Sequence, residues 1–419
     1  MSELPPEISE SLRADFDAVA AIGRDPAGGW TRPAYGDREC EAHRWFATTA
    51  EAAGLAVRQD AFGNSIARRE GRTGAPAVAI GSHLDTVTRG GLFDGALGVL
   101  AGLEIARRVV PGPEDLALEI IAFRDEEGRF GALTGSRAMA GDLPHDALSS
   151  MRDADGISLR SAMRDAGLPV ESASAAKRNL EEIAAYLELH IEQGPVLETG
   201  GESVGIVTAI AGQKRLAIRF TGTAGHAGTT PMDLRHDAFA AAAEFAVGFR
   251  SMIVDEGQGT ARGTIGIVKT SPNQGNVIPG EVRIGLEIRD ASAALLAHLA
   301  ERTAALAAEA GLRHGVEVGH RVIYEAAPVP MAPQLMDLLE GEARALAIPC
   351  RRLLSGANHD AGILGAHIPA AMLFVPSRGG VSHTPEEHTD WHHIEAATAV
   401  LEGCVRRLIS AEQTMSFPA

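Results

Sequence analysis

The fold of this chain is decided by the stretch AVAIGSHLDT, residues 77–86, in which a short apolar run ends in polar residues. Four consecutive apolar residues, Ala77 to Ile80, are typical of a strand buried on both faces of a parallel sheet. Pro76 precedes them, and a proline is tolerated at the start of a strand. Ligands of parallel α/β sheets bind beyond the carboxyl ends of the strands. The residues after Ile80 are therefore candidates for a functional site.

The segments around this strand alternate between helical and strand patterns. Helices are expected at Glu41–Ala53 and Gly95–Val110, and a strand pair is expected within Ala56–Arg69. A second buried strand follows at Leu116–Phe123. This order predicts an α/β fold with a mainly parallel sheet and helices on both of its faces.

The pattern changes near Gly212, where the order becomes strand, helix, strand, strand, helix, strand, the ferredoxin-like split arrangement. The expected elements are Lys214–Thr221, Asp237–Ser251, Thr260–Lys269, Glu281–Arg289, Ser292–Ala310 and Val316–Ala326. After Pro328 the α/β rhythm returns, with elements at 334–347, 370–375 and 394–410. We therefore predict a discontinuous α/β domain, residues 1–211 and 328–419, that contains an inserted α+β domain, residues 212–327. The segment Leu143 to Leu180 matches none of these patterns.

Composition excludes several classes of partner. The 419 residues have a formal net charge of −17, whereas nucleic-acid-binding proteins usually present a basic face. An anionic substrate is not excluded, because local arginines can reverse the field inside one cleft. No apolar run reaches the ~20 residues that span a bilayer, and the N-terminus lacks a signal-peptide pattern. Three scattered cysteines fit a reducing compartment. We expect a cytoplasmic protein without a nucleic-acid or membrane partner.

Imidazoles and carboxylates gather in four motifs that follow predicted strands or lie near them. The motifs are His83-Leu84-Asp85 with Asp94 beyond it, Asp125-Glu126-Glu127, His190-Ile191-Glu192-Gln193, and Ser382-His383-Thr384. These ligand types suit zinc, manganese, cobalt or nickel. Three histidines and two carboxylates fit two divalent ions about 3.5–4 Å apart that share one carboxylate. A single histidine is more often a surface or core residue, but four such motifs in one α/β chain favour a metal site.

Beyond these motifs, the chain resembles the M20 metallopeptidase-type amidohydrolases. The similarity is to the branch of N-carbamoyl-L-amino-acid hydrolases, β-ureidopropionases and allantoate amidohydrolases, and it covers nearly the whole chain. It begins at GGWTRPAY, residues 28–35, and runs to HTPEE, residues 383–387. The motifs typical of the branch are HIEQGP, residues 190–195, and SGANHDA, residues 355–361. Many M20 peptidases have Asp or Glu at the position of His190, which favours the carbamoylase branch.

The resemblance implies a set of metal ligands. One divalent ion would be bound by His83, Asp94 and His190. The other would be bound by Asp94, Glu127 and His383, so that Asp94 bridges the two ions. Zinc or manganese is expected, and cobalt or nickel would also suit these ligands.

The resemblance also implies which residues act on the substrate or on the ligands. Asp85 would orient His83. Glu126 would be the general base that transfers a proton from a metal-bridged water to the leaving nitrogen. The peptide bond between Asp94 and Gly95 would be cis, which is costly and usually linked to function.

Five further residues would contact the substrate, by the same resemblance. His226 would stabilise the oxyanion, often across a dimer, and Asn276 and Arg289 would bind the substrate carboxylate. A planar guanidinium matches a carboxylate in two hydrogen bonds. Gln193 and His359 would hydrogen-bond the ureido or amide group. The alternatives are a turn histidine for His226, a surface salt bridge for Arg289, and loop packing for Gln193 and His359.

The function implied is hydrolysis of an N-carbamoyl-L-amino acid to the amino acid, carbon dioxide and ammonia. Allantoate amidohydrolase activity is the first alternative, and an aminoacylase or dipeptidase that cleaves a plain amide is the second. A non-catalytic binding protein would be favoured by loss of the base or of a ligand, and this chain retains all of them. The resemblance further implies a homodimer formed through the inserted domain, which would also act as a lid.

Overall fold

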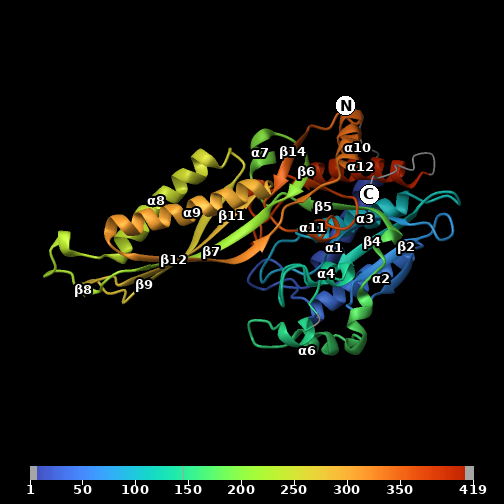
Figure 1. The fold of residues 1–419 in the computed structure, drawn as a ribbon. Coiled ribbons are helices and arrows are strands. Elements are labelled where there is room, and N and C mark those ends of the chain that lie inside the picture. The colour runs from blue at the N-terminus through green and yellow to red at the C-terminus, as the bar shows by residue number, and fades with distance from the viewer. Residues whose placement is uncertain (1–6, 145, 411–419) are drawn as a thin grey trace. The chain divides into compact units, whose positions relative to one another are not determined.

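The computed structural model describes residues 7–144 and 146–410 (Figure 1). The chain divides into two compact units, a larger unit of residues 1–208 and 331–419 and an inserted unit of residues 209–330. The boundaries expected from the sequence, 212 and 327, fall inside the inserted unit and close to its ends. Each unit contains its own sheet.

The sheet of the larger unit has four parallel strands at its centre. In spatial order these strands are β4 (Ala117–Phe123), β3 (Ala77–His83), β5 (Ile183–Ile191) and β15 (Ala370–Val375). Every residue of β3 and β4 is buried, so both faces of the sheet are covered there. The prediction of an α/β fold with a mainly parallel central sheet is confirmed.

Antiparallel strands flank the parallel centre. On one side β2 (Ser65–Arg69) pairs with β4 and also with β1 (Ala56–Gln59). On the other side β6 (Val204–Ile210) pairs with β15, and β14 (Cys350–Ser355) pairs with β6. The four central parallel strands are those whose carboxyl ends carry the polar motifs.

Strand β5 lies at the centre of the sheet but was not predicted as a strand. Its sequence, IAAYLELHI, includes Glu188 and His190, and both side chains are buried. A central strand is normally recognised by an unbroken apolar run, and these two residues interrupt it. Buried polar side chains are costly unless they have partners, so their presence in a central strand indicates a functional site.

Helices pack closely on the sheet because small residues face it. α3 (Ala96–Arg108) lies against β3, β4 and β5, and a Cβ atom at Gly98 would be only 2.5 Å from the carbonyl oxygen of Leu189. α12 (Trp391–Ile409) packs on α3 and on α10 (Pro333–Ala345). None of the helices in the described part of the chain is long and apolar enough to cross a bilayer.

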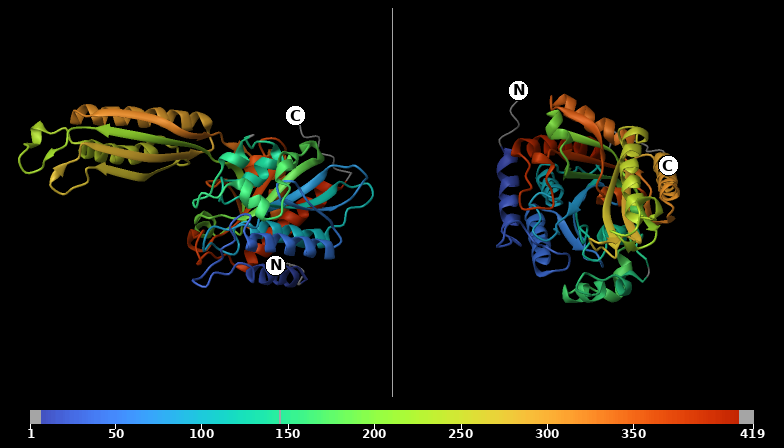
Figure 2. Two further views of the ribbon diagram at one scale, coloured as in Figure 1. Left: turned by 90° about the horizontal axis from the view of Figure 1, so that it is seen from below. Right: turned by 90° about the vertical axis from the view of Figure 1, so that its left-hand side faces the viewer.

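Other helices complete the larger unit (Figures 1 and 2). α1 (Glu7–Ala20) packs on α3, and α2 (Asp37–Ala52) packs on β1 and β2. α4 (Thr134–Ala140) contacts α11 (Asp360–Leu364), which in turn contacts β5 and β15.

The segment Leu143 to Leu180, which no sequence pattern explained, forms short helices around a small separate core. α5 (Ala147–Ser150), α6 (Leu159–Asp165) and a 3₁₀ helix (Val170–Ala176) follow one another. Apolar side chains from this segment pack against Tyr35, Phe62 and Phe130. Because each helix is shorter than about two turns, no helical periodicity is visible in the sequence.

The inserted unit has one sheet and two long helices. Its main elements are β7 (Gly212–Thr221), α8 (Ala238–Glu256), β9 (Arg262–Ser271), β11 (Glu281–Asp290), α9 (Ala293–His314) and β12 (Glu317–Ala326). The strand order is β12-β7-β11-β9 and all neighbours are antiparallel. A short ribbon of β8 (Gly225–His226) and β10 (Val277–Ile278) is added to this core.

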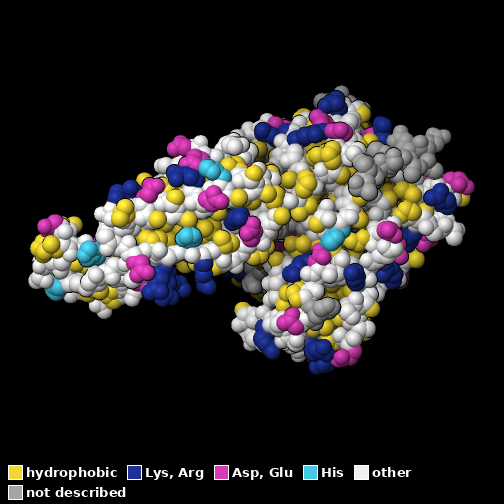
Figure 3. All heavy atoms as spheres, in the orientation of Figure 1, with side chains coloured by type: hydrophobic (Ala, Val, Ile, Leu, Met, Phe, Trp, Pro, Cys, Tyr) yellow, Lys and Arg dark blue, Asp and Glu magenta, His cyan; other side chains and the backbone are white. Residues whose placement is uncertain are grey.

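The two faces of the inserted sheet differ in chemistry. Leu216, Ile218 and Phe220 alternate along β7 on the face that α8 and α9 cover. The open face carries Arg219 directly opposite Arg283, and both guanidinium groups bind the carboxylate of Glu281. Figure 3 shows Lys and Arg side chains gathered along the lower edge of this unit.

Candidate active site

Each of the five ligands expected from the sequence lies in the larger unit at or after a parallel strand. His83 ends β3, Asp94 precedes α3, Glu127 follows β4, His190 lies near the end of β5, and His383 lies between β15 and α12. His83, Asp94 and His190 are almost fully buried. Because the carboxyl ends of neighbouring parallel strands meet at one edge, the fold brings these side chains together.

Asp94 is the residue that the two groups of ligands share. Its Oδ1 lies 3.2 Å from Nε2 of His190 and 3.5 Å from Nε2 of His83. Its Oδ2 lies 3.3 Å from Nε2 of His383, which is 3.5 Å from Oε2 of Glu127. In each group the ligand atoms lie within 4.8 Å of one another, which is compatible with one ion per group. One carboxylate therefore faces both groups, each through a different oxygen.

The histidines present lone pairs to these carboxylates. Nδ1 of His83 lies 3.1 Å from the carbonyl oxygen of Asp85, and Nδ1 of His190 lies 2.9 Å from that of Ile191. A carbonyl only accepts, so each Nδ1 carries a proton, and in the neutral form of each ring Nε2 is the acceptor that can bind a metal. Nε2 of His83 is buried without a hydrogen-bond partner. Acceptors that face acceptors need a proton or a cation between them, and the donor set fits divalent cations.

Asp85 ties the two loops of the site together. Its carboxylate accepts the backbone N–H of Glu126 at 3.3 Å and that of Glu127 at 3.1 Å. Its Oδ1 also lies 3.4 Å from Nδ1 of His83. The buried carboxylate of Asp85 thus fixes the ring of His83 and the backbone of Glu126 and Glu127.

The turn after β4 directs neighbouring carboxylates to different places. Asp125 has a φ of 54° and accepts hydrogen bonds from the hydroxyl of Thr134 and the N–H of Phe130 in the interior. Glu126 points into the site, where its Oε2 lies 3.6 Å from Nε2 of His83. Burial raises the pKa of Glu126 well above its usual value, and neighbouring Glu127 raises it further. Glu126 belongs to neither ligand group, as a general base requires.

Gln193 and His359 both lie beside the candidate ligands. The side-chain N–H of Gln193 donates to Oδ2 of Asp94 at 2.8 Å. The ring of His359 packs on His190 with centroids 4.5 Å apart, and its buried Nε2 has no hydrogen-bond partner. Burial lowers the pKa of His359 well below its usual value, so this ring is neutral. In the described residues the amide of Gln193 is thus engaged with Asp94, whereas His359 keeps a free ring nitrogen.

The three substrate residues expected in the inserted unit do not lie together. His226 and Asn276 are neighbours in the β8–β10 ribbon, where the carbonyl oxygen of Asn276 accepts the N–H of Ala227 at 3.0 Å. Arg289 lies near the other end of β11 and forms an ion pair with Glu287. The strand from Glu281 to Arg289 spans about 27 Å, and Figure 1 shows β8 at the far tip of the inserted unit. Asn276 and Arg289 of one chain therefore cannot bind one small carboxylate together.

The prediction of a cis peptide bond between Asp94 and Gly95 is wrong. Among the described residues the cis peptide bond is Ser271–Pro272, so the bond after Asp94 is trans. Gly95 instead has a φ of 66°, and a Cβ atom there would lie 2.4 Å from the ring of His83. A residue without a side chain is needed because the backbone passes directly over a ligand.

Glu387 is a functional candidate that the sequence did not single out. Its Oε1 accepts the N–H groups of Phe93 and Asp94 at 3.0 and 3.1 Å, and its Oε2 accepts the hydroxyl of Ser382 at 3.1 Å. It therefore fixes the backbone of the shared ligand. The signal was its place in HTPEE, four residues after His383.

Arg32 is the second candidate that was missed, although it lies in the GGWTRPAY stretch. The side chain is fully buried, and its Nε donates to the carbonyl oxygen of Leu84, between His83 and Asp85, at 2.8 Å. No carboxylate of the described residues lies within ion-pair distance of it, and its NH2 group has no hydrogen-bond partner. Burial lowers its pKa to about 10, against the opposing effect of Asp85. A buried cation without a paired anion is costly, which indicates a role in balancing the nearby acids.

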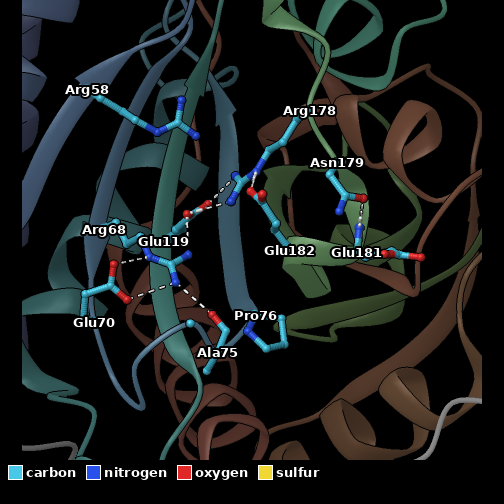
Figure 4. A pocket seen from close by; sticks show the side chains of 11 residues that line it. Arg58, Arg68, Glu70, Ala75, Pro76, Glu119, Arg178, Asn179, Glu181 and Glu182 are labelled. Carbon is cyan, nitrogen blue, oxygen red and sulfur yellow. Dashed lines mark hydrogen bonds and ion pairs between the residues drawn. The ribbon is translucent and has the colours of Figure 1, made fainter.

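A pocket of about 480 Å³ lies at the opposite end of β3 from these ligands (Figure 4). Buried Glu119 binds Arg68 at 2.8 Å and Arg178 at 2.6 Å across it. Ala75 and Pro76, which precede β3, complete its wall. Glu119 and its two arginines are paired with one another, so these side chains form no candidate catalytic site.

The fold and the site define the class of metal-dependent α/β enzymes. Three imidazoles and two carboxylates meet at the carboxyl ends of parallel strands, with a further, largely buried glutamate beside them. Residues 79–407 match the model of Peptidase family M20/M25/M40, and the chain belongs to this family. The resemblance drawn from the motifs is thereby confirmed.

Similar proteins cover nearly the whole chain. An N-carbamoyl-L-amino acid amidohydrolase of Geobacillus stearothermophilus is 41% identical over 406 residues, which cover 94% of this chain and 97% of that protein. An allantoate amidohydrolase of Bacillus subtilis is 35% identical, with 96% and 98% covered. The crystal structure of an amidase of the hydantoinase/carbamoylase family from Burkholderia multivorans matches with a TM-score of 0.88 at 32% identity, with 96% and 99% covered.

Metal binding should release protons. Asp94 and Glu127 raise the pKa of His383 to about 9, and burial raises that of Glu127 to about 7. At pH 7 the imidazole of His383 is mostly protonated and must lose its proton to bind a cation. We therefore expect the affinity of metal-stripped protein for zinc to rise from pH 7 to pH 9. Calorimetry at pH 7 in two buffers of different ionisation enthalpy should show at least about one proton released per chain. His383→Ala should release fewer, and a proton count of zero in both proteins would contradict the prediction.

Arg32 should act through its charge. Arg32→Lys and Arg32→Gln both keep N–H donors on a shorter side chain, but only lysine keeps the positive charge. Because that charge offsets the repulsion between Asp85 and Glu127, we expect kcat of the glutamine variant to fall about tenfold below that of the lysine variant. KM should change little in both. Equal kcat values would assign Arg32 a purely hydrogen-bonding role, and thermal unfolding would show whether both variants fold.

Proposed function

We propose that this protein hydrolyses the ureido C–N bond of an N-carbamoyl-L-amino acid and releases the amino acid, carbon dioxide and ammonia. The observation that carries the proposal is Glu126, a largely buried carboxylate 3.6 Å from His83 that belongs to neither ligand group. Similar proteins that are named N-carbamoyl-L-amino-acid amidohydrolases, such as that of Paenarthrobacter aurescens at 38% identity over 89% of this chain, support the substrate class.

Two divalent cations, zinc or manganese, would be held by the two ligand groups that share Asp94. When bound, they supply the charge that lowers the pKa of the attacking water and polarises the substrate carbonyl. Glu126 accepts the proton of that water and donates it to the leaving nitrogen. A carboxyl group whose pKa is raised by burial is suited to both steps. Its carboxylate is a stronger base towards water, and its protonated form is still acidic enough to protonate the leaving nitrogen. Asp85 holds the backbone of Glu126 and the ring of His83 in place during both steps.

Allantoate is the second candidate substrate, because it presents a ureido group and a carboxylate to the same site. The Bacillus subtilis allantoate amidohydrolase, of which 98% is covered at 35% identity, supports this alternative. An aminoacylase or dipeptidase that acts on a plain amide is a weaker alternative. A cytoplasmic location, suggested by the three cysteines, which are all free, stays a prediction.

We also propose that the protein is a homodimer, joined by its inserted unit, and that this unit acts as a lid. Strand β9 has a free edge with Ile267 and Val268 more than half exposed. On α8, which packs on β9, Val247 and Val254 are each at least 70% exposed. An apolar edge strand is a liability unless another strand or chain covers it, and two copies can cover each other symmetrically.

The separation of His226 and Asn276 from Arg289 supports the same dimer. The three residues cannot reach one substrate within a single chain. A second copy could supply His226 and Asn276 to a site that uses Arg289 of the first copy. Arg289 would then bind the substrate carboxylate, Asn276 would bind it from the partner, and His226 would stabilise the oxyanion.

Glu126→Gln tests the catalytic role. The amide cannot take a proton from water, so we expect kcat to fall about 10²–10⁴-fold while bound metal stays unchanged. Turnover is followed as ammonia released from N-carbamoyl-L-amino acids and allantoate, and as free amino acid released from N-acetyl amino acids and dipeptides, with manganese or zinc added. Release from ureido acids alone supports the proposal. Turnover of only N-acetyl or peptide substrates would contradict the ureido assignment, and wild-type turnover by Glu126→Gln would remove the base.

Complementation tests the shared site. His226→Ala and Arg289→Ala should each be nearly inactive as homodimers. Hybrid dimers that carry one chain of each variant contain one complete site, so an equal mixture that is unfolded and refolded should regain about a quarter of wild-type activity. A mixture of His226→Ala with Asn276→Ala, which remove residues from the same partner, is the matched control and should regain none. No recovery in the first mixture would contradict a site formed by two chains.

A further inference from the structure

A second concentration of imidazoles lies at the start of α12, outside the ligand groups described above. Asp390 precedes the helix, and His392 and His393 lie in its first turn. The ligand atoms of these three residues lie within 4.8 Å of one another. Nε2 of His388 lies 3.3 Å from Oδ1 of Asp390 and adds a third imidazole. None of the four residues belongs to the groups that share Asp94.

One buried ring nitrogen of this cluster has no hydrogen-bond partner among the described residues. The rings of His392 and His393 face each other with centroids 3.8 Å apart. Nδ1 of His393 is buried and has no hydrogen-bond partner among the described residues. Two imidazoles and a carboxylate that converge in this way are ligand types that bind divalent cations.

We propose that Asp390, His392 and His393 bind a further divalent cation. Imidazole-rich sites favour zinc, copper, nickel or cobalt over manganese and magnesium, and zinc is the occupant we infer. The site is separate from the active site but lies near it, since the ring of His388 packs edge-on against Phe93, whose N–H is bound by Glu387.

Arg378 limits the affinity of this site. Its NH2 group lies 2.6 Å from Oδ1 of Asp390, the oxygen that also faces His388. A fixed positive charge this close opposes a bound cation, as does the positive end of the dipole of α12. The site should therefore bind zinc more weakly than the central site, and the removal of Arg378 should strengthen it.

Zinc counting on the metal-loaded protein tests the proposal. Equilibrium dialysis against micromolar zinc, followed by elemental analysis, should find one zinc per chain fewer in His392→Ala/His393→Ala than in wild type. His320→Ala/His367→Ala removes two exposed histidines elsewhere and should keep the wild-type count. An equal count in the wild type and the His392→Ala/His393→Ala variant would overturn the proposal. The count needs no substrate, so it is decided separately from the proposed hydrolysis.

Arg378→Ala should strengthen zinc binding at this site, whereas a misfolded variant would bind less zinc. Zinc titration of protein whose central site is already filled should show about three- to tenfold tighter binding in this variant than in wild type. Unchanged binding would exclude Asp390 as a ligand and overturn the proposal. Catalytic turnover, where a substrate is found, should stay within about twofold of wild type in His392→Ala/His393→Ala, because the cluster shares no ligand with the central site.

Discussion

The main physical constraint on this structure is the repulsion between carboxylates that lie close together at the carboxyl ends of the parallel strands. Asp85, Asp94, Glu126 and Glu127 lie within one small region, and Asp360 and Glu188 are buried behind them. Like charges at such distances cannot all stay ionised in the absence of positive charge. Burial and Glu188 raise the pKa of Asp360 to about 8, so that this carboxyl group is neutral at pH 7. The negative charge that remains on the other carboxylates favours the binding of divalent cations at this site.

The fold holds these acids in place by hydrogen bonds from groups that are themselves fixed. Asp85 receives two backbone N–H groups from the turn after β4, and Glu387 receives two from the loop that carries Asp94. Arg32 holds the carbonyl oxygen of Leu84 and adds a buried positive charge. A residue after β3 thus supports the ligand after β4, and a residue after β15 supports the shared ligand after β3. Such preorganisation lets a site bind charge without rearranging.

The sequence predicted the features that are local and missed those that depend on three-dimensional neighbours. Apolar runs located β3, β4 and β15, and polar motifs after them located most of the ligands. Strand β5 was missed because Glu188 and His190 interrupt its apolar run. Arg32 was missed because a lone arginine shows no sign of burial until its neighbours are known. The trans bond at Gly95 and the role of Glu387 depend on close approaches that no spacing in the sequence reveals.

The antiparallel register of the inserted unit explains why its proposed substrate residues call for a second chain. Arg289 pairs with Gln213, next to the point where the chain enters the unit, whereas the ribbon of His226 follows the opposite end of β7. An antiparallel strand fixes this separation, because a shift in register would turn its apolar side chains out of the core. No local loop movement can bring Arg289 and Asn276 to one carboxylate. A two-fold symmetric pair that brings the tip of one copy to the base of the other would form two equivalent sites, so dimerisation and substrate recognition would be one requirement on the same surface.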